Sequence, residues 1–438
     1  MIPAMVRFVG TVPITTNDTI HAIVAEAHAA QKDWAARPVA DRVAVLERAC
    51  RVLTGRVDEM AELFSREMGK DIRRSTGEVQ GVVYGTVQTA REVADAIQQQ
   101  RRGGQIIEYI PLGVTAVISP WNYPLAMANN LIIPALVAGN TVVFKPSEET
   151  PLIAQPFVDA LNTVLPTGVL HIVQGRRDLG QALVEADVNM IAFTGSQAAG
   201  KDIMRRAAGS LKRLVIELGG NDPMIVLPDA DIDRAAQFFA VASSFENAGQ
   251  MCISTERIYV HDSVAETFEQ RVTEIAARYR IGPWNQPGVN IGPIINDTQR
   301  KGVIDHIDDA IVKGARVLLG GKDHPDHYVA PTVPADVTPE MDIARDETFG
   351  PVVAISRYSD TDEAVRLANA SDYGLGAAVF GGDEAVAVGR RLEAGMVGIN
   401  SGSGGGGDAP WVGAKQSGFG FHGSADGHRQ FAQVRLIG

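Results

Sequence analysis

The sequence predicts an α/β protein with two parallel sheets. Its 438 residues are too many for one ordinary hydrophobic core and favour two or three domains. From residue 106, short β-branched runs alternate with helix-length segments, as in parallel strands joined by crossover helices. A second alternation of this kind follows Cys252. We therefore expect two α/β domains, each with its own sheet.

The first hundred residues are predicted to be helical. Residues 16–37 begin with capping residues and carry apolar side chains three and four positions apart. In the next predicted helix, residues 40–53, Cys50 falls on the apolar face with Leu46 and Leu53. Free cysteine packs as a small hydrophobe, so we expect Cys50 to be a buried core thiol without a chemical role.

The predicted strands of the first α/β region end in small polar clusters. Ligands of such sheets bind beyond the carboxyl ends of the strands, so these clusters should face one crevice. In chain order they are SPWNYP, KPSE, VQG, FTGS and ELGG. The second region has strands at ERIYVH, ARVLLGG, VVAISRY and AAVFGG, with helices over residues 263–280 and near 361–370. The glycine-rich segment 401–409 is either a flexible linker or a loop at the substrate cleft.

Composition narrows the class of function. The formal net charge of −12 argues against a nucleic-acid groove or an anionic membrane surface as a partner. The most apolar stretch is interrupted by prolines and asparagines, and the N-terminus lacks the long apolar run of a secretory signal. With two cysteines and no address label, we expect a soluble cytoplasmic protein. The nine histidines are scattered, and no metal site is expected.

The segment ENAGQMCIS, residues 246–254, contains the second cysteine. Asn247, Gly249 and Gln250, beside Cys252, neither pack a core nor sustain a helix. A thiolate is the strongest nucleophile among side chains, but an unperturbed pKa near ~8.5 leaves only a small fraction ionised at neutral pH. A catalytic Cys252 therefore needs a lowered pKa or a nearby base. The alternative is an idle thiol in a loop.

Two further residues suggest chemistry at strand ends. Asn122 lies in a turn fixed by two prolines and offers an amide donor, which an oxyanion hole requires, although asparagine is also a common turn former. Glu217 ends an apolar strand and is followed by two glycines. Desolvation of a carboxyl group there raises its pKa, as suits a general base, whereas the alternative is a cap on the next element.

A nucleotide site is suggested without a G-x-G-x-x-G motif. FTGSQAAGK places Gly195 and Gly200 at a strand-to-helix turn, where bare amides and a helix N-terminus can meet a pyrophosphate. Lys145 and Glu148 of KPSE follow another strand. This pair can hydrogen-bond ribose hydroxyls, or it can be an exposed ion pair.

Taken together, SPWNYP, KPSE, FTGS, ELGG, GQMC and ETFGP resemble, in order and spacing, the aldehyde dehydrogenase superfamily. The likeness extends from the first helices to KQSGFG near residue 418. It implies two Rossmann-like parallel α/β domains and a small β extension for oligomerisation. The implied division is residues 1–100 and 116–217 for the NAD-binding domain, 218–410 for the catalytic domain, and 101–115 with 411–438 for the oligomerisation strands.

The resemblance also implies roles for individual residues. Cys252 corresponds to the nucleophile, Glu217 to the base and Asn122 to the oxyanion donor of an NAD(P)-dependent oxidation of an aldehyde to its acid, through a thiohemiacetal and a thioester. The implied cofactor-binding residues are Ser119, Trp121, Lys145, Ser147, Glu148, Gly175, Gly180, Phe193, Thr194, Gly195, Ser196, Leu218, Gly219, Glu347 and Phe349. Glu148 accepts a hydrogen bond from a ribose 2′-hydroxyl but repels a 2′-phosphate, so NAD is expected to be preferred over NADP.

The implied partner is a small-molecule aldehyde, bound by a homodimer or homotetramer, with no nucleic acid or membrane involved. Glu246, Met251 and Ile253 are expected to line the substrate cleft. There Glu246 would disfavour aldehydes that carry their own carboxylate, unless it turns away and pairs with a neighbouring arginine or a backbone amide. Two rival functions stay open at this point: an enzyme that passes the acyl group to coenzyme A, and a catalytically silent binding or structural relative.

Overall fold

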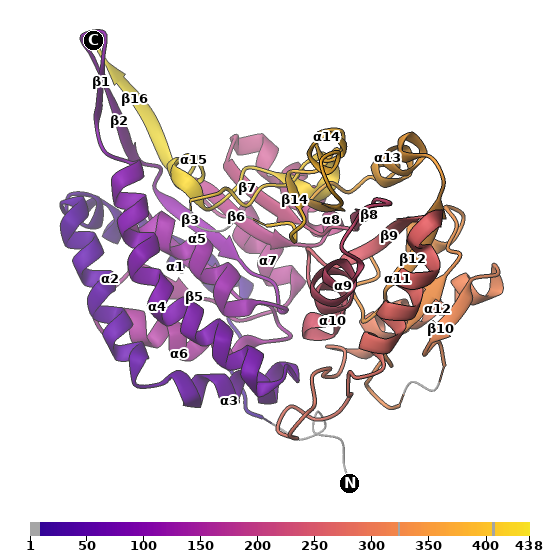
Figure 1. The fold of residues 1–438 in the computed structure, drawn as a ribbon. Helices are drawn as coiled ribbons and strands as arrows, with labels where there is room; N and C mark the ends of the chain where they lie inside the picture. Colours follow the sequence, from indigo (N-terminus) through magenta and orange to yellow (C-terminus); the bar gives the residue numbers. More distant parts are fainter. Residues whose placement is uncertain (1–8, 323–324, 405–407) are drawn as a thin grey trace.

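The computed structural model describes residues 9–322, 325–404 and 408–438. The chain forms two lobes, each built on a parallel sheet, and an antiparallel arm that projects from the first lobe (Figure 1). The N-terminal helices and the first sheet form one lobe, and the chain from β8 to β14 forms the other. The predicted α/β architecture with two parallel sheets is confirmed.

Four helices open the chain, and the first of them packs directly on strands of the first sheet, whereas the other three pack on one another and on the crossover helices. The four are α1 (Asn17–Ala35), α2 (Val39–Thr54), α3 (Val57–Met68) and α4 (Ile72–Ala96). Gly69, in the left-handed region at φ 85°, ends α3, and the Asp71 carboxylate then caps α4 by accepting a hydrogen bond from the Arg74 amide. Cys50 is buried in α2, as predicted, and burial raises its pKa to about 11.

The first sheet has the strand order β15-β7-β6-β3-β4-β5. Its strands are β3 (Val114–Ile118), β4 (Thr141–Lys145), β5 (Leu170–Ile172), β6 (Met190–Gly195), β7 (Arg213–Leu218) and β15 (Gly418–Phe419). All neighbours are parallel except β15, which pairs antiparallel with the end of β7. The crossovers are α5 (Pro124–Val137), α6 (Pro151–Asn162), α7 (Arg177–Glu185) and α8 (Gln197–Ala207). Burial of all of β4, and of all of β3 except its last residue, explains the continuous apolar runs of the sequence.

The second sheet has the order β12-β9-β8-β13-β14, with all pairs parallel. Its strands are β8 (Asp222–Val226), β9 (Thr255–His261), β12 (Ala354–Tyr358), β13 (Gly376–Phe380) and β14 (Met396–Ile399). Its helices are α9 (Ile232–Arg234), a π-helical turn (Ala235–Val241), α10 (Ala242–Phe245), α11 (Asp262–Ala276), α12 (Asp297–Val312), α13 (Thr361–Asn369) and α14 (Ala385–Gly389). A separate ribbon pairs β10 (Arg316–Leu319) with β11 (Val333–Ala335).

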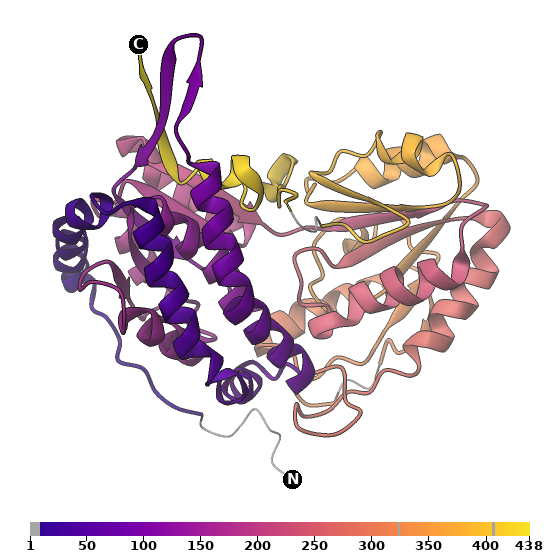
Figure 2. The same ribbon diagram turned by 60° about the vertical axis from the view of Figure 1, so that its left-hand side comes forward.

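The arm is a three-stranded antiparallel sheet of β1 (Gln100–Arg102), β2 (Gln105–Pro111) and β16 (Ala432–Ile437). It extends away from both lobes, with the C-terminus at its end (Figure 2). A short helix, α15 (Ser424–Arg429), precedes β16.

The expected domain division stays a prediction. Residue 116, its limit for the second part of the NAD-binding domain, lies within β3, and β15, within the expected oligomerisation residues 411–438, pairs into the first sheet. This β15 pairing depends on Gly418, at φ 113°, because a Cβ at this position would collide with the carbonyl oxygen of Ile216. The expected cleft loop at 401–409 is described only in part, since residues 405–407 lie outside the described residues.

No described helix is long and apolar enough to cross a membrane. No group of three or more histidine, cysteine, aspartate or glutamate side chains is arranged to hold a metal ion in the part of the chain that the structure describes.

Candidate active site

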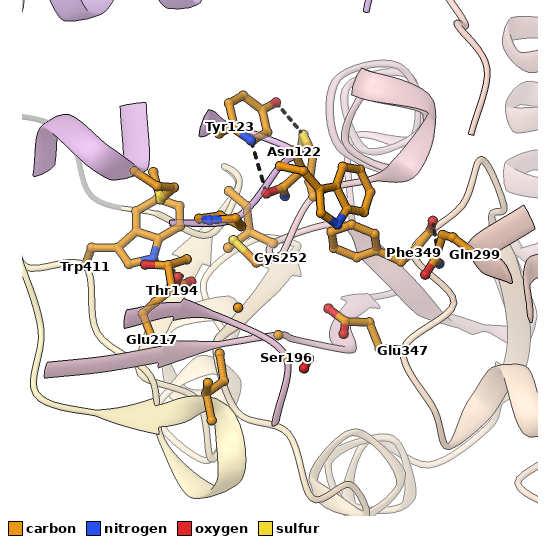
Figure 3. A pocket seen from close by; sticks show the side chains of 18 of the residues that line it. Asn122, Tyr123, Thr194, Ser196, Glu217, Cys252, Gln299, Glu347, Phe349 and Trp411 are labelled. Carbon is orange, nitrogen blue, oxygen red and sulfur yellow. Dashed lines mark hydrogen bonds between the residues drawn. The ribbon is translucent and has the colours of Figure 1, made fainter. Parts of the chain in front are cut away.

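A pocket of about 460 Å³ lies where the strand ends of the first lobe meet the segment that precedes β9. Most of the residues predicted for the site line this central pocket. They are Trp121, Asn122, Thr194, Gly195, Ser196, Glu217, Leu218, Gly219, Glu246, Met251, Cys252, Ile253, Glu347 and Phe349. In Figure 3, Cys252 lies between Glu217, Thr194 and Trp411 on one side and Phe349, Gln299 and Glu347 on the other.

An unusual backbone turn positions Cys252. Asn247, Ala248 and Gly249 follow one another in the left-handed region, at φ 51°, 57° and 74°. Such conformations are costly for residues with a Cβ and persist only where the surroundings enforce them. A Cβ at Gly249 would collide with the carbonyl oxygen of Gly350, so this glycine lets the turn pack against the ETFGP segment.

Asn122 is fixed by several hydrogen bonds. Its Nδ2 donates to the Gln250 carbonyl at 3.0 Å, and its Oδ1 accepts from the Tyr123 amide at 3.1 Å. The buried Lys70 ammonium donates to the Asn122 carbonyl at 2.9 Å. The side-chain amide therefore lines the pocket in one orientation, with one N–H engaged by Gln250 and the other available to a ligand.

Glu217 ends β7 and is 3% exposed. Its Oε1 accepts a hydrogen bond from Trp411 Nε1 at 3.3 Å, whereas Oε2 has no partner of good geometry among the described residues. Burial raises its pKa to about 7, and the hydrogen bond from Trp411 partly opposes this rise. Glu217 can therefore exchange a proton near neutral pH.

The Cys252 thiol and the Glu217 carboxylate line the same pocket, and each shifts the pKa of the other. Burial raises the pKa of Cys252 well above its usual value, and the charge of Glu217 raises it further. At neutral pH the pair therefore holds the proton on sulfur, and Glu217 is the adjacent base that can remove it. The nearby base that a catalytic Cys252 requires is therefore available in the same pocket.

The ETFGP segment closes the opposite side of the pocket. The Glu256 carboxylate accepts hydrogen bonds from the amides of Thr348 and Phe349, at 2.7 and 2.8 Å. Glu347 Oε1 accepts from the Gly220 amide at 3.0 Å. A Cβ at Gly219 would collide with the Glu347 carboxylate, which accounts for the first of the two glycines that follow β7.

The end of β6 has the features of a dinucleotide site. Ser196 caps α8, and a Cβ at Gly195 would collide with the Phe193 ring, so the backbone is bare at this helix N-terminus. The buried polar atoms Ser119 Oγ, Thr194 Oγ1 and Gln197 Nε2 have no hydrogen-bond partner among the described residues. Unmet buried donors at such a turn fit a bound phosphate-bearing ligand.

Seven predicted cofactor residues lie outside the lining of the central pocket. They are Ser119, Lys145, Ser147, Glu148, Gly175, Gly180 and Phe193. The buried Lys145 ammonium lies 3.4 Å from a Glu148 oxygen, and a Cβ at Gly180 would contact the Lys145 side chain. The pair predicted from KPSE is therefore formed, with one member buried.

Several pocket residues were missed by the sequence reasoning. Tyr123, whose hydroxyl donates to Met251 Sδ at 3.1 Å, and Pro120 lie within the quoted SPWNYP motif. Met127, Gln299 and Trp411 also line the pocket. Trp411 lies two positions after the glycine-rich segment 401–409, but no local pattern marked its contact with Glu217, which is 194 positions away.

Glu246 has features of both alternatives that the sequence left open, since it lines the cleft and also lies near an arginine. It lines the central pocket, and its Oε1 lies 3.6 Å from Arg74 Nε. Its side chain is 43% exposed.

Comparison with known proteins gives a consistent result. The model of the aldehyde dehydrogenase family matches residues 1–437. The chain belongs to the aldehyde dehydrogenase family. A putative succinate-semialdehyde dehydrogenase [NADP(+)] of Mycobacterium bovis is 37% identical, over 98% of this chain and 85% of its own.

Solved structures agree with this membership. Succinate-semialdehyde dehydrogenase from Burkholderia pseudomallei has a TM-score of 0.95 and 35% identity, over 99% of this chain and 92% of its own. The NADP complex of NADP-dependent glyceraldehyde-3-phosphate dehydrogenase from Bacillus halodurans has a TM-score of 0.93 and 35% identity, over 97% and 92%. The predicted fold class and activity are confirmed: this chain is an NAD(P)-dependent aldehyde dehydrogenase that oxidises an aldehyde to its acid.

The prediction of a preference for NAD over NADP is wrong. The mycobacterial relative is named for NADP(+), and the Bacillus structure contains NADP. The prediction rested on repulsion between the Glu148 carboxylate and a 2′-phosphate. In the structure, the Lys145 ammonium lies 3.4 Å from that carboxylate and offsets its charge, so repulsion by Glu148 alone does not decide the preference.

Proposed function

We propose that this dehydrogenase forms its acid product through a thioester on Cys252, with Glu217 as the base and Asn122 as the oxyanion donor. The supporting observation is that one pocket of about 460 Å³ is lined by all three side chains. Glu217 also keeps one carboxylate oxygen without a partner of good geometry among the described residues.

In the first step, Glu217 takes the thiol proton of Cys252, and the thiolate adds to the aldehyde carbon. The alkoxide that forms accepts hydrogen bonds from Asn122 Nδ2 and from the Cys252 backbone amide. One such donor typically contributes about 3 kcal/mol to the stability of the transition state. The Lys70 and Gln250 contacts hold Asn122 in place, so this donor is oriented before the substrate arrives.

In the second step, the thiohemiacetal on Cys252 is oxidised to a thioester. When bound, the nicotinamide cofactor supplies the oxidising power by accepting a hydride. The amides at the start of α8, together with Glu347 and Phe349, would hold that cofactor. Glu217, having released its first proton to solvent, then removes a proton from water. The hydroxide attacks the thioester, the acid leaves and the Cys252 thiol is restored.

We also propose NADP as the cofactor of this chain. The names and the bound ligand of the relatives support this choice. The buried Lys145 provides a positive charge at the end of β4, where it offsets Glu148.

The quaternary structure is proposed to be a homodimer or homotetramer formed through the arm. β16 is an edge strand of the arm sheet, and Val434, Leu436 and Ile437 on it are 53%, 57% and 42% exposed. An exposed apolar edge strand favours pairing with another chain. The expected cytoplasmic location stays a prediction.

The proposal is tested by NADPH formation from a panel of aldehydes. Cys252→Ala should lose at least about a thousandfold in turnover, since the covalent step is removed. Cys50→Ala, which removes the buried thiol of α2, is the matched control and should retain turnover. Turnover of Cys252→Ala within tenfold of the unaltered enzyme would refute the role of this thiol.

A further inference from the structure

A second cavity of about 450 Å³ adjoins the central pocket, and we call it the outer pocket. Tyr123 and Glu246 line both cavities, so the two meet at these side chains. The outer pocket lies between α4 and α5, which contribute most of its lining. The part of a substrate that extends away from Cys252 therefore has room beyond the central pocket.

Side chains missing from α4 create this space. Gly77, Gly81 and Gly85 are four positions apart and share one face of the helix, and a Cβ at each would meet no atom within 4 Å. Opposite them, Asn129 of α5 is 4% exposed. Its Oδ1 accepts from Thr86, while its amide nitrogen has no hydrogen-bond partner among the described residues. The outer pocket thus offers both space and an unused donor.

Most charges around the two cavities are compensated. The Lys70 ammonium lies 2.8 Å from a Glu78 oxygen, and Glu78 also accepts hydrogen bonds from two amides at the start of α5. The Arg74 guanidinium lies 2.7 Å from an Asp71 oxygen and donates to a backbone carbonyl. These two pairs leave little net charge.

Glu246 is the carboxylate that lines both pockets. Its contact with Arg74, at 3.6 Å, is longer than a hydrogen bond, and Arg74 is already paired with Asp71. No lysine, arginine or histidine is found among the described residues that line the central pocket. A negative group on a substrate would therefore meet a carboxylate at the junction and no unpaired cation.

We infer that the substrate is an aldehyde whose far end carries a positive charge, and that Glu246 binds this cationic group where the two pockets meet. The inference rests on the proposed function, because it takes Cys252 as the point at which the aldehyde carbon is held. It separates this chain from the relatives that are named for succinate semialdehyde, whose far end is a carboxylate.

The test uses aldehydes that differ in charge and little else. 4-(Trimethylammonio)butanal is cationic and cannot cyclise, 5,5-dimethylhexanal is its uncharged isostere, and succinic semialdehyde supplies the anion. The ratio of kcat/KM for the cation to that for the isostere measures the contribution of charge alone. In the unaltered enzyme this ratio should exceed one and should fall as salt is added, because salt screens an exposed carboxylate.

Two variants and a control assign the effect to Glu246. Glu246→Gln should lower the ratio by about fivefold, the size expected of a partly exposed ion pair. Arg74→Gln should raise it, since the junction then loses a positive charge. Glu62→Gln, at an exposed position of α3 that lines neither pocket, should leave the ratio unchanged.

The outcomes separate this inference from the proposed function. A ratio that Glu246→Gln leaves unchanged, or a preference of the unaltered enzyme for succinic semialdehyde over the uncharged isostere, would overturn the inference. In either case, turnover of the uncharged aldehyde would still support the proposed function. If none of the three aldehydes gave NADPH or NADH in a Cys252-dependent manner, the proposed function itself would fail.

Discussion

The two sides of Cys252 are built from different parts of the fold. On one side, Thr194 and Glu217 sit at neighbouring positions of the parallel strands β6 and β7, deep in the first lobe. On the other, Glu246 and Arg74 come from a short turn and from helix α4, and they stand at the junction of two cavities.

We expect this difference in position to separate the residues that catalyse the reaction from those that select the substrate. Glu217 is 3% exposed, and burial raises its pKa to about 7, so its surroundings tune its affinity for protons. The Glu246 side chain is 43% exposed, so we expect its charge to act on the substrate. Changes on the strand side should therefore alter turnover for every aldehyde, whereas changes on the helix side should alter which aldehyde is preferred.

Among the changes that test this contrast, the largest effect is expected at Asn122. Asn122→Ala removes one donor to the alkoxide and should lower kcat by about a hundred- to a thousandfold for charged and uncharged aldehydes alike. Steady-state kinetics with the matched aldehydes will measure this. Asn130→Ala, which alters only the outer pocket, is the control and should leave kcat for the uncharged aldehyde intact. A loss of kcat confined to one class of aldehyde would contradict the proposed separation of catalysis from substrate preference.

A smaller effect is expected from pH. The pKa of Glu217 is raised to about 7, so below this pH the carboxyl group is protonated and cannot accept a proton. Where hydrolysis limits turnover, kcat should rise about tenfold per pH unit up to pH 7 and then level off. The profile of Glu246→Gln should keep this inflection, and that of Glu217→Gln should lose it. An inflection that survives in Glu217→Gln would assign the titration to another group.

The smallest effect is expected at Glu148. The Lys145 ammonium already offsets its charge, so Glu148→Gln should change kcat/KM for NADP by less than about threefold. Initial rates at limiting NADP and at limiting NAD will show this. A gain of tenfold or more for NADP would mean that Glu148 repels the 2′-phosphate despite Lys145.

The same contrast explains which strands and site residues could be predicted from the sequence and which could not. Strands at residues 114–118, 190–195 and 213–218 were recognisable because buried parallel strands are continuous apolar runs, and polar clusters at their ends marked Asn122 and Glu217. Trp411 was not recognisable, because its contact with Glu217 depends on how a distant segment folds back. Arg74 was missed for the same reason, since nothing local to α4 indicates that it faces Glu246.

The cofactor prediction failed for a different physical reason. Lys145 and Glu148 were both identified, but the balance between two opposite charges depends on their separation and burial. Neither quantity can be obtained from spacing alone. Similarly, the sequence located Glu246 beside the cleft but left open whether an arginine would pair with it. In the structure Arg74 lies 3.6 Å from Glu246 and is also paired with Asp71.

The central claim, a thioester on Cys252 that Glu217 hydrolyses, is tested most directly by trapping that thioester. The Glu217→Gln variant should be incubated with aldehyde and NADP, and the masses of its peptides should then be measured by mass spectrometry. We predict one equivalent of NADPH, little further turnover, and a Cys252 peptide heavier by the mass of the aldehyde less two hydrogens. Continued turnover with an unmodified Cys252 peptide would contradict the account.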